Sequence, residues 1–229
     1  MKRIAVITAR SGSKGLKDKN ILPICGKPLL AHSVEAAVQS GLFDRVILST
    51  DSEEYGSIGV EYGAEFIKRS EKNAGDAAPT FAVLEELFAS IGTDFDYFVL
   101  LQPTSPMRNA THVKEACRLF EERMQDFDFL VSMCPSHLPS VLVRPIEEDT
   151  SLKYFDTDFS NYRRQGARDY SPNGALYIAK PEAYLRQKHF YGARATSYVM
   201  DAYSSVDVDD LIDYEFAKLL MEKREKGLL

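Results

Sequence analysis

Cysteine, histidine and long apolar runs are scarce in this sequence, and each shortage excludes a class of protein. The three cysteines, Cys25, Cys117 and Cys134, are odd in number and far apart, unlike a disulfide framework or a zinc site. The four histidines are scattered, which argues against a catalytic triad. No apolar run approaches the roughly 18 residues of a membrane-spanning helix. A disulfide-rich, zinc-binding or membrane-spanning protein is therefore not expected.

Basic residues are in the minority, with 28 Lys and Arg against 34 Asp and Glu and a net charge of −6. This balance argues against nucleic acid as the main partner. The basic start of the chain is followed by an apolar run that stops at Thr8, too early for a signal peptide. We therefore expect a cytoplasmic protein that binds neither nucleic acid nor membrane.

Apolar runs of strand length alternate with segments of helical periodicity. The runs cover residues 4–9, 46–50, 97–102 and 129–133, and they are continuous, as in strands covered on both faces. Helical patterns cover residues 29–38, 79–91, 111–124 and 211–226. In the first of these, Pro28 is expected at the first helical position and Gly41 at the end. The alternation predicts one α/β domain over residues 1–229, with a mostly parallel sheet flanked by helices.

The alternation breaks between residues 136 and 170. This segment mixes prolines, charged residues and aromatic residues without a helical period. We interpret residues 136–170 as an arm inserted into the domain.

A loop rich in cations follows the first apolar run and contains Arg10, Lys14, Lys17 and Lys19. It matches neither G-x-x-x-x-G-K-[ST] nor G-x-G-x-x-G, so it is not one of the usual phosphate loops. Four cations in so short a loop nevertheless repel one another unless an anion lies between them. We therefore expect this loop to bind an anion such as phosphate. A solvated cation cluster without a ligand is the alternative.

Two further polar stretches, residues 49–51 and 102–106, follow later apolar runs. Ligands of open α/β sheets bind beyond the carboxyl ends of the strands, so these loops can converge with the first one. For the earlier stretch we favour a simpler interpretation, in which residues 50–52 cap the next helix.

Near the C-terminus, Val206 and Val208 alternate with Asp207 and Asp209. If this segment is a strand, both carboxylates share one face and repel unless a cation lies between them. Mg²⁺ binds one or two carboxylates together with waters and substrate phosphates. The alternative is that Asp209 or Asp210 caps the following helix. We expect Asp210 to cap that helix, and Asp207 and Asp209 to bind Mg²⁺ or another divalent cation. A metal site and a cationic loop in the same chain suggest phosphoryl or nucleotidyl transfer.

Six motifs together resemble one family, the CMP-sialic acid synthetases (acylneuraminate cytidylyltransferases), over nearly the whole chain. The motifs are Ala9-Arg10-Ser11-Gly12-Ser13-Lys14-Gly15 with Lys19-Asn20, Gly26-Lys27-Pro28-Leu29-Leu30, Ser49-Thr50-Asp51, Leu101-Gln102-Pro103-Thr104-Ser105-Pro106 with Arg108, Pro172-Asn173-Gly174, and Val206-Asp207-Val208-Asp209. The resemblance implies a Rossmann-like nucleotidyltransferase fold. It also implies a reaction in which CTP and an acidic 2-keto sugar give the CMP-sugar and pyrophosphate, because the anomeric hydroxyl attacks the α-phosphate.

The resemblance also implies roles for single residues. The catalytic group is Arg10, Lys14, Lys19 and Asp209. The nucleotide-binding group is Ala9, Arg10, Ser13, Asn20, Arg69, Asp76 and Thr80. The sugar-binding group is Gln102, Ser105, Arg163 and Asn173, and Asp207 and Asp209 would bind the metal. The arm at residues 136–170 is similar to one that family members exchange across a homodimer, with Arg163 reaching toward the partner's site.

Two positions depart from the family pattern on the sugar side. After Cys134-Pro135 the family usually has two histidines and a nearby lysine, whereas this chain has His137 alone and no lysine. Before Pro172-Asn173-Gly174 the family usually has arginine, and this chain has Ser171. The sugar therefore stays open among acylneuraminate, legionaminic acid, pseudaminic acid and a shorter ulosonic acid. A nucleotide-binding module without catalytic activity is the alternative from another class.

Overall fold

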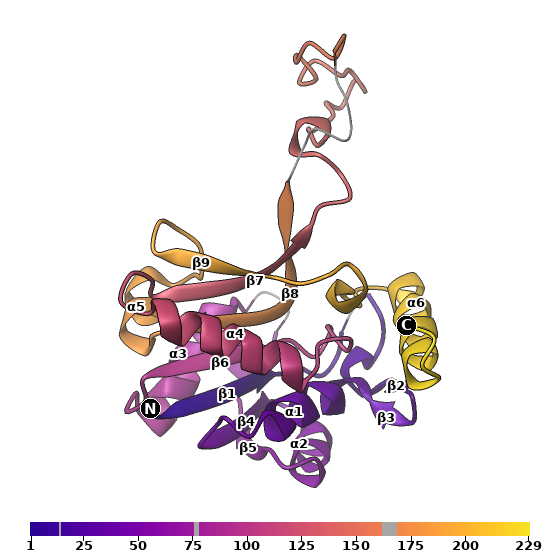
Figure 1. Ribbon diagram of the computed structural model, residues 1–229. Helices are drawn as coiled ribbons and strands as arrows, with labels where there is room; N and C mark the ends of the chain where they lie inside the picture. Colours follow the sequence, from indigo (N-terminus) through magenta and orange to yellow (C-terminus); the bar gives the residue numbers. More distant parts are fainter. Residues whose placement is uncertain (14, 76–77, 162–168) are drawn as a thin grey trace.

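A seven-stranded sheet forms the centre of the computed structural model, which describes residues 1–13, 15–75, 78–161 and 169–229 (Figure 1). The strand order is β5-β4-β1-β6-β8-β7-β9. The strands are β1 (Arg3–Thr8), β4 (Arg45–Thr50), β5 (Glu65–Lys68), β6 (Tyr97–Leu101), β7 (Phe129–Pro135), β8 (Tyr170–Ala179) and β9 (Ala195–Val199). All neighbours are parallel except β8, which runs antiparallel to β6 and to β7. The predicted α/β fold with a mostly parallel sheet is confirmed.

Helices cover both faces of this sheet. They are α1 (Leu29–Ser40), α2 (Glu53–Glu61), α3 (Thr80–Ile91), α4 (Ala110–Arg123), α5 (Pro181–Gln187) and α6 (Leu211–Glu225). Side chains of α1, α2 and α4 share one buried cluster, and those of α3 and α5 share the cluster on the opposite face. Helix α6 packs instead on the small hairpin of β2 (Pro23–Ile24) and β3 (Lys27–Pro28) at the end of the sheet (Figure 1). None of the described helices is long and apolar enough to cross a lipid bilayer.

Burial on both faces explains why the central strands read as unbroken apolar runs. In β1, Ala5 and Ile7 belong to the cluster under α1 and α4, whereas Ile4 and Val6 belong to the cluster under α3. Successive side chains of a strand point to opposite faces, so a strand covered on both sides needs an apolar residue at every position. This pattern places the core on the two sides of β1 and β6.

The prediction for the first helix was right at its end and wrong at its start. Gly41 follows the last residue of α1 with φ 65°, a left-handed conformation that glycine adopts without strain. Pro28 lies one position before the helix instead of in its first turn. The reason is that Pro28 is still paired with Pro23 in the β2–β3 hairpin, so the helix begins only at Leu29.

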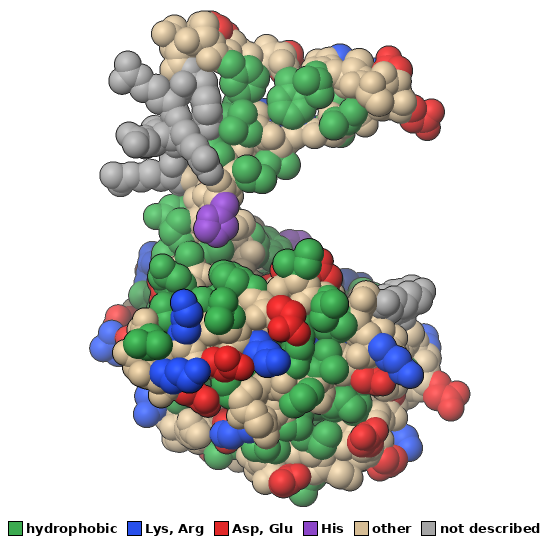
Figure 2. All heavy atoms as spheres, turned by 90° about the vertical axis from the view of Figure 1, so that its right-hand side faces the viewer, with side chains coloured by type: hydrophobic (Ala, Val, Ile, Leu, Met, Phe, Trp, Pro, Cys, Tyr) green, Lys and Arg blue, Asp and Glu red, His purple; other side chains and the backbone are tan. Residues whose placement is uncertain are grey.

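The segment that joins β7 to β8 projects away from the body of the molecule (Figure 1). Its described residues include one short 3₁₀ helix, Ser140–Leu142. Several large apolar side chains of this segment are exposed, namely those of Leu138, Val143, Ile146 and Leu152. Figure 2 shows hydrophobic side chains gathered on this projecting part, which we call the arm.

Asp210 begins helix α6 in the way that the sequence predicted. Its carboxylate accepts hydrogen bonds from the backbone N–H groups of Ile212 and Asp213, at 2.8 and 3.0 Å. Asp213 in turn accepts from the N–H of Asp210, at 3.2 Å, which completes a capping box.

Replacing Asp210 by alanine removes this cap, and we expect Asp210→Ala to lower the free energy of unfolding by about 1 kcal/mol. Asp210→Asn is the matched control, because an asparagine side chain still accepts from both N–H groups. Urea unfolding of the three proteins measures the difference. Equal midpoints for Asp210→Ala and the wild type would contradict the capping role.

Candidate active site

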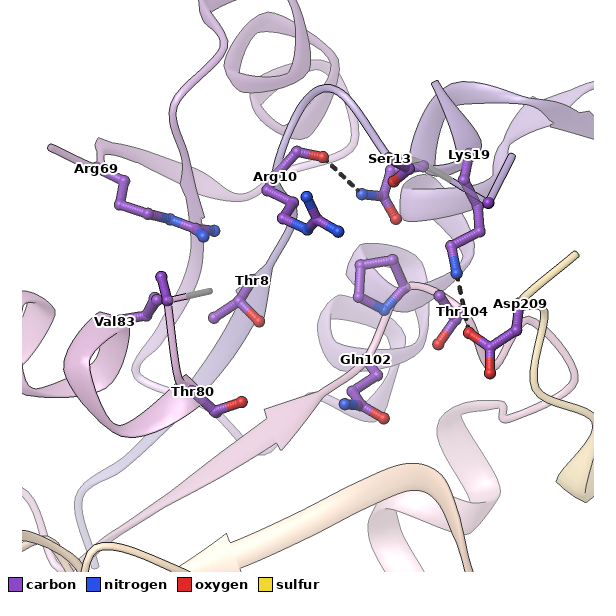
Figure 3. Close-up of a pocket in the computed structure, with 14 residues that line it drawn as sticks. Thr8, Arg10, Ser13, Lys19, Arg69, Thr80, Val83, Gln102, Thr104 and Asp209 are labelled. Carbon is purple, nitrogen blue, oxygen red and sulfur yellow. Dashed lines mark hydrogen bonds and ion pairs between the residues drawn. The ribbon is translucent and has the colours of Figure 1, made fainter. Parts of the chain in front are cut away.

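The loops that follow β1 and β6 line one cavity together with Arg69, which follows β5. Strand β1 lies between β4 and β6, with Thr8 opposite Ser49 and Ile7 opposite Leu101, so the loops that follow the strands start side by side. The cavity has a volume of about 440 Å³. It is lined by Thr8, Arg10, Ser13, Gly15, Lys19, Asn20, Arg69, Ala78, Thr80, Val83, Gln102, Pro103, Thr104 and Asp209 (Figure 3). This is the edge at which open α/β sheets bind ligands.

Cations outnumber carboxylates among the described residues that line the cavity. Arg10, Lys19 and Arg69 contribute to its wall, whereas Asp209 is the single carboxylate among those residues. In Figure 3 the side chains of Arg10 and Arg69 enter the same space from different elements. A cavity with this balance of charge attracts an anion.

Arg69 is held rigidly and is only partly satisfied. The guanidinium is buried, and it donates to the backbone oxygens of Ser49 at 2.8 Å and Asn73 at 3.3 Å. Its Nε atom has no hydrogen-bond partner among the described residues. Burial lowers the pKa of Arg69. Because a buried donor without a partner is costly, an anionic or carbonyl oxygen in the cavity would stabilise this side chain.

The loop from Arg10 to Asn20 is anchored by a residue that sequence reasoning did not assign to the site. The carboxylate of Asp51 accepts a hydrogen bond from the N–H of Ser11 at 2.9 Å and another from the Ser11 hydroxyl. Burial opposes the ionisation of Asp51, but the two hydrogen bonds from Ser11, together with a further backbone hydrogen bond and the charge of Arg69, lower the pKa. Asn20 holds the other end of the loop by donating to the backbone oxygen of Arg10 at 3.0 Å. The helix cap expected at residues 50–52 is supplied by Ser52 alone, which accepts from the N–H of Tyr55.

The segment from Val206 to Asp209 is not a strand, so the alternation expected of its side chains needs correction. It follows the 3₁₀ helix Tyr203–Ser205 and is paired with no described strand. Asp207 is mostly buried, whereas 79% of the Asp209 side chain is exposed. The two carboxylates are two positions apart in the chain, and the charge of Asp209 helps to raise the pKa of Asp207.

Val208 connects this segment to the turn after β6 and to the loop after β1, which both line the cavity. Its N–H donates to the backbone oxygen of Thr104 at 2.8 Å, and its own oxygen accepts from Lys19 Nζ at 2.7 Å. Lys19 also forms an ion pair with Asp209 at 3.1 Å (Figure 3). A methyl group at Gly15 would lie 3.1 Å from the backbone oxygen of Asp209, so the loop packs against the segment from Val206 to Asp209.

Asp207 occupies the position best suited to a cation. Its Oδ1 atom is buried and has no hydrogen-bond partner among the described residues. Burial raises the pKa of Asp207, and the nearby charge of Asp209 adds to the shift. A buried carboxylate beside a second carboxylate is stabilised by a positive charge between them. The donor set therefore fits a hard divalent cation.

A cation bound here would complete its coordination with water or ligand oxygens. Within residues 1–13, 15–75, 78–161 and 169–229, no three His, Cys, Asp or Glu side chains gather into a metal site. Two carboxylates with the remaining positions open are typical of Mg²⁺ that binds together with a phosphate ligand.

Eight of the residues expected at the site line the cavity: Arg10, Ser13, Lys19, Asn20, Arg69, Thr80, Gln102 and Asp209. Four others, Ala9, Ser105, Asn173 and Asp207, do not line it. Lys14, Asp76 and Arg163 lie outside the described residues. Lys17 is exposed and does not line the cavity.

Asn173, expected to bind the sugar, is buried and bonded within the protein. Its oxygen accepts from the Ser132 hydroxyl at 2.6 Å, and its nitrogen donates to the Ser205 hydroxyl at 2.9 Å. These bonds join β7 and β8 to the segment that leads to Asp207. Two other expected residues are also covered, because Ala9 uses its N–H to bond the Ser49 oxygen and Ser105 is fully buried.

Sequence reasoning missed a second cavity that adjoins the first. It has a volume of about 240 Å³ and shares Thr80 and Gln102 with the cavity described above. Its wall is mainly aromatic and includes Phe81, Tyr177, Tyr184, Phe190 and Tyr191. These aromatic residues are spaced along the sequence like ordinary core residues, so no pattern identified them as a site.

Comparison with known proteins gives one family and several relatives. The family model described as "Cytidylyltransferase" matches residues 4–228. An N-acylneuraminate cytidylyltransferase from Escherichia coli O18:K1:H7 is 45% identical over 98% of this chain and 53% of its own length. A CMP-N,N'-diacetyllegionaminic acid synthase from Legionella pneumophila is 32% identical over the full length of both proteins. The chain thus spans about half the length of the first relative and the whole of the second.

Among solved structures, the chain is similar to a CMP:2-keto-3-deoxy-manno-octonic acid synthetase in complex with CTP. The TM-score is 0.72 over 98% of this chain and 100% of the other. Because the sequence identity is 20%, this likeness supports the fold and nothing further.

Replacing Asp207 by asparagine removes the buried charge while keeping the shape of the side chain. In EDTA we expect Asp207→Asn to melt at a temperature equal to or above that of the wild type, because an uncompensated carboxylate is no longer buried. Millimolar Mg²⁺ should raise the melting temperature of the wild type and leave that of Asp207→Asn unchanged.

Differential scanning fluorimetry with and without Mg²⁺ measures both shifts. Asp210→Asn, in the same segment, is the control and should respond to Mg²⁺ like the wild type. An equal response of Asp207→Asn and the wild type to Mg²⁺ would remove Asp207 from the cation site.

Proposed function

The chain belongs to the cytidylyltransferase family, in the group that includes the N-acylneuraminate cytidylyltransferases, and on that basis we propose that it activates an acidic 2-keto sugar with CTP. The products are the CMP-sugar and pyrophosphate. The N–acylneuraminate activity is favoured because the relative of that name is 45% identical to this chain. The protein would accordingly be an enzyme that supplies a nucleotide sugar.

One observation supports this proposal above the others. A single cavity contains three cations, two from the loop after β1 and one that follows β5, and it lies against a pair of carboxylates from the opposite end of the chain. A nucleoside triphosphate with a divalent cation satisfies both sets of charges at once. A neutral ligand satisfies neither set, and an anion without a cation leaves Asp207 buried and uncompensated.

The reaction is a displacement at the α-phosphorus. The anomeric oxygen of the sugar forms the new O–P bond, the bond to the β-phosphate oxygen breaks, and pyrophosphate leaves while the hydroxyl proton passes to solvent. Arg10, Lys14 and Lys19 would bind the phosphate oxygens, on which negative charge shifts during the displacement. Arg69, with one N–H that has no partner among the described residues, would also bind the nucleotide.

Asp207 and Asp209 would hold the divalent cation, which we propose to be Mg²⁺. When bound, Mg²⁺ neutralises charge on the phosphate oxygens of the triphosphate. Lys19 pairs with Asp209 and lines the cavity, so it would also contact a phosphate bound beside that carboxylate. The lysine and the carboxylate therefore act on the same end of the nucleotide.

The aromatic cavity is suited to the sugar. Because it shares Thr80 and Gln102 with the charged cavity, a molecule bound there lies next to the nucleotide. Phe190 and Tyr177 offer apolar surface to an acyl group, and Lys188 offers a cation to a carboxylate. Ser171 pairs with Cys134 at the base of the arm, where the family usually has arginine, so the sugar need not be acylneuraminate itself.

We propose further that a second copy of the chain covers the arm. Val143, Ile146 and Leu152 are exposed by 57%, 62% and 59%, and the arm projects from the body without packing on it in Figures 1 and 2. Clustered apolar side chains of this size are rarely left in water on a stable surface. A symmetric dimer would bury them in both copies.

The central test is pyrophosphate release by the purified protein with CTP, Mg²⁺ and a panel of nonulosonic acids. We expect release only when all three are present and about a 100-fold loss of turnover in Asp209→Asn, because one ligand of the cation is weakened. Mass spectrometry of the product identifies the sugar.

Asp210→Asn is the control for that assay and should turn over like the wild type. No pyrophosphate with any acid of the class would refute the enzymatic proposal and leave a nucleotide-binding module. Wild-type turnover in Asp209→Asn would refute the role of that carboxylate alone.

The dimer is tested separately with Ile146→Asp. A charge placed in the covered surface should shift the molar mass, measured by light scattering on a sizing column, from dimer to monomer. Val60→Asp is a control, because Val60 is 57% exposed on α2 in the body of the molecule. A monomeric wild type, or a dimeric Ile146→Asp, would contradict the proposal.

A further inference from the structure

Arg108 is the largest side chain that the fold buries completely, with 1% of its surface exposed. It lies between the turn that follows β6 and the start of α4. An arginine is almost never fully buried unless its charge is paired. Here, in the part of the chain that the structure describes, no carboxylate forms an ion pair with it.

The guanidinium bonds neutral oxygens from three different elements. Nε donates to the backbone oxygen of Ala175 in β8 at 3.3 Å. One terminal nitrogen, Nη2, donates to the backbone oxygen of Gln102 at 3.2 Å and to the hydroxyl of Ser33 in α1. The other, Nη1, is buried and has no partner among the described residues. Burial lowers the pKa of Arg108 to about 9, so the group stays charged at neutral pH.

Of these three oxygens, that of Gln102 belongs to a residue that lines the candidate site, and that of Ala175 belongs to the residue after Gly174. The Gln102 oxygen also accepts from the Ser33 hydroxyl at 3.0 Å and from the N–H of Ser105 at 3.4 Å, so three donors fix it. Ala175 follows Gly174, at which a methyl group would lie 2.7 Å from Gln102 Oε1 and 3.1 Å from Asp207 Oδ2. Arg108 thus bonds the backbone at Gln102 and at Ala175, and the neighbouring Gly174 packs closely against the side chains of Gln102 and Asp207.

We propose that Arg108 is a positioning residue that fixes Gln102 against Gly174 and so sets the geometry at the junction of the charged and the aromatic cavities. This inference rests on the proposed function. Gln102 lines both cavities, so its displacement changes the binding of the acid sugar. Lys19 and Arg69 are bonded to oxygens other than those that Arg108 holds, so the binding of CTP should change little.

The planar fork of arginine explains why this residue serves here. Its N–H groups point in fixed directions within one plane, so a single side chain reaches oxygens just after β6, on α1 and on β8 together. Lysine keeps the charge but offers one compact donor group on a flexible stem. A comparison of lysine with methionine therefore separates the contribution of the charge from that of the geometry.

The experiment measures KM for the acid sugar, KM for CTP and kcat in Arg108→Lys, Arg108→Met and Ser33→Ala. We expect the KM for the sugar to rise about tenfold in Arg108→Lys and further in Arg108→Met, with the KM for CTP within about threefold of the wild type. Ser33→Ala removes one hydroxyl from the network and should raise the KM for the sugar about threefold. Arg118→Lys, an exposed arginine on α4, is the matched control and should leave all three constants unchanged.

Hydrogen–deuterium exchange gives a second measurement that does not depend on the reaction. Faster exchange is expected for residues 102–108 and 173–176 in Arg108→Lys and Ser33→Ala, with exchange in α2 unchanged. A wild type without pyrophosphate release would refute the proposed function, while the exchange result would still decide whether Arg108 orders these segments.

If the wild type is active and the folded variants have the same KM for the sugar as the wild type, the positioning role is overturned. Equal increases of both KM values, which indicate a general loss of structure, would also overturn it. If Arg108→Lys and Arg108→Met do not fold, Ser33→Ala decides by the same criteria.

Discussion

Two hydrogen bonds of the Val208 backbone bring an N-terminal loop and a C-terminal segment of the chain together at the candidate site. Its N–H donates to the Thr104 oxygen at the end of β6, and its oxygen accepts from Lys19 in the loop after β1, which is 189 positions away. Val208 itself is fully buried. These two bonds keep the backbone between Asp207 and Asp209 next to the cationic loop, although that loop is remote in sequence. Strands β1 and β6 supply the rigid edge on which both contacts depend.

This constraint brings together groups that are not satisfied by the protein alone. Arg69 keeps an unpartnered N–H, and Asp207 keeps an unpartnered oxygen, in the part of the chain that the structure describes. Such groups reduce stability until a ligand supplies the missing charges. Electrostatic preorganisation of this kind is also what allows a site to stabilise charge that shifts during a reaction, because the donors need not reorient. Arg108 follows the same principle behind the cavity wall, because its buried charge would fix the position of Gln102 without contacting the ligand.

Much of the fold could be predicted because its cause is local. A strand covered on both faces needs an unbroken apolar run, and β1 and β6 have one; a capping carboxylate precedes a helix, and Asp210 does so. The antiparallel direction of β8 and the start of α1 after Pro28 depend on pairing with distant strands, which a single sequence does not show. In the candidate site, Arg10 and Asp209 were indicated by clusters of like charge. Asp51 was not indicated, because it bonds the loop at Ser11 without lining the cavity, and Tyr177 was not, because it is spaced along the sequence like a core residue.

The most direct measurement is a crystal structure of the protein with CTP and Mn²⁺, in which the anomalous signal locates the metal independently of the protein atoms. We expect one Mn²⁺ within bonding distance of Asp207 and Asp209, and a triphosphate that contacts both that metal and Arg10. A nucleotide bound away from the carboxyl edge of β1, or a metal that touches neither aspartate, would contradict the assignment of this cavity as the site where CTP reacts.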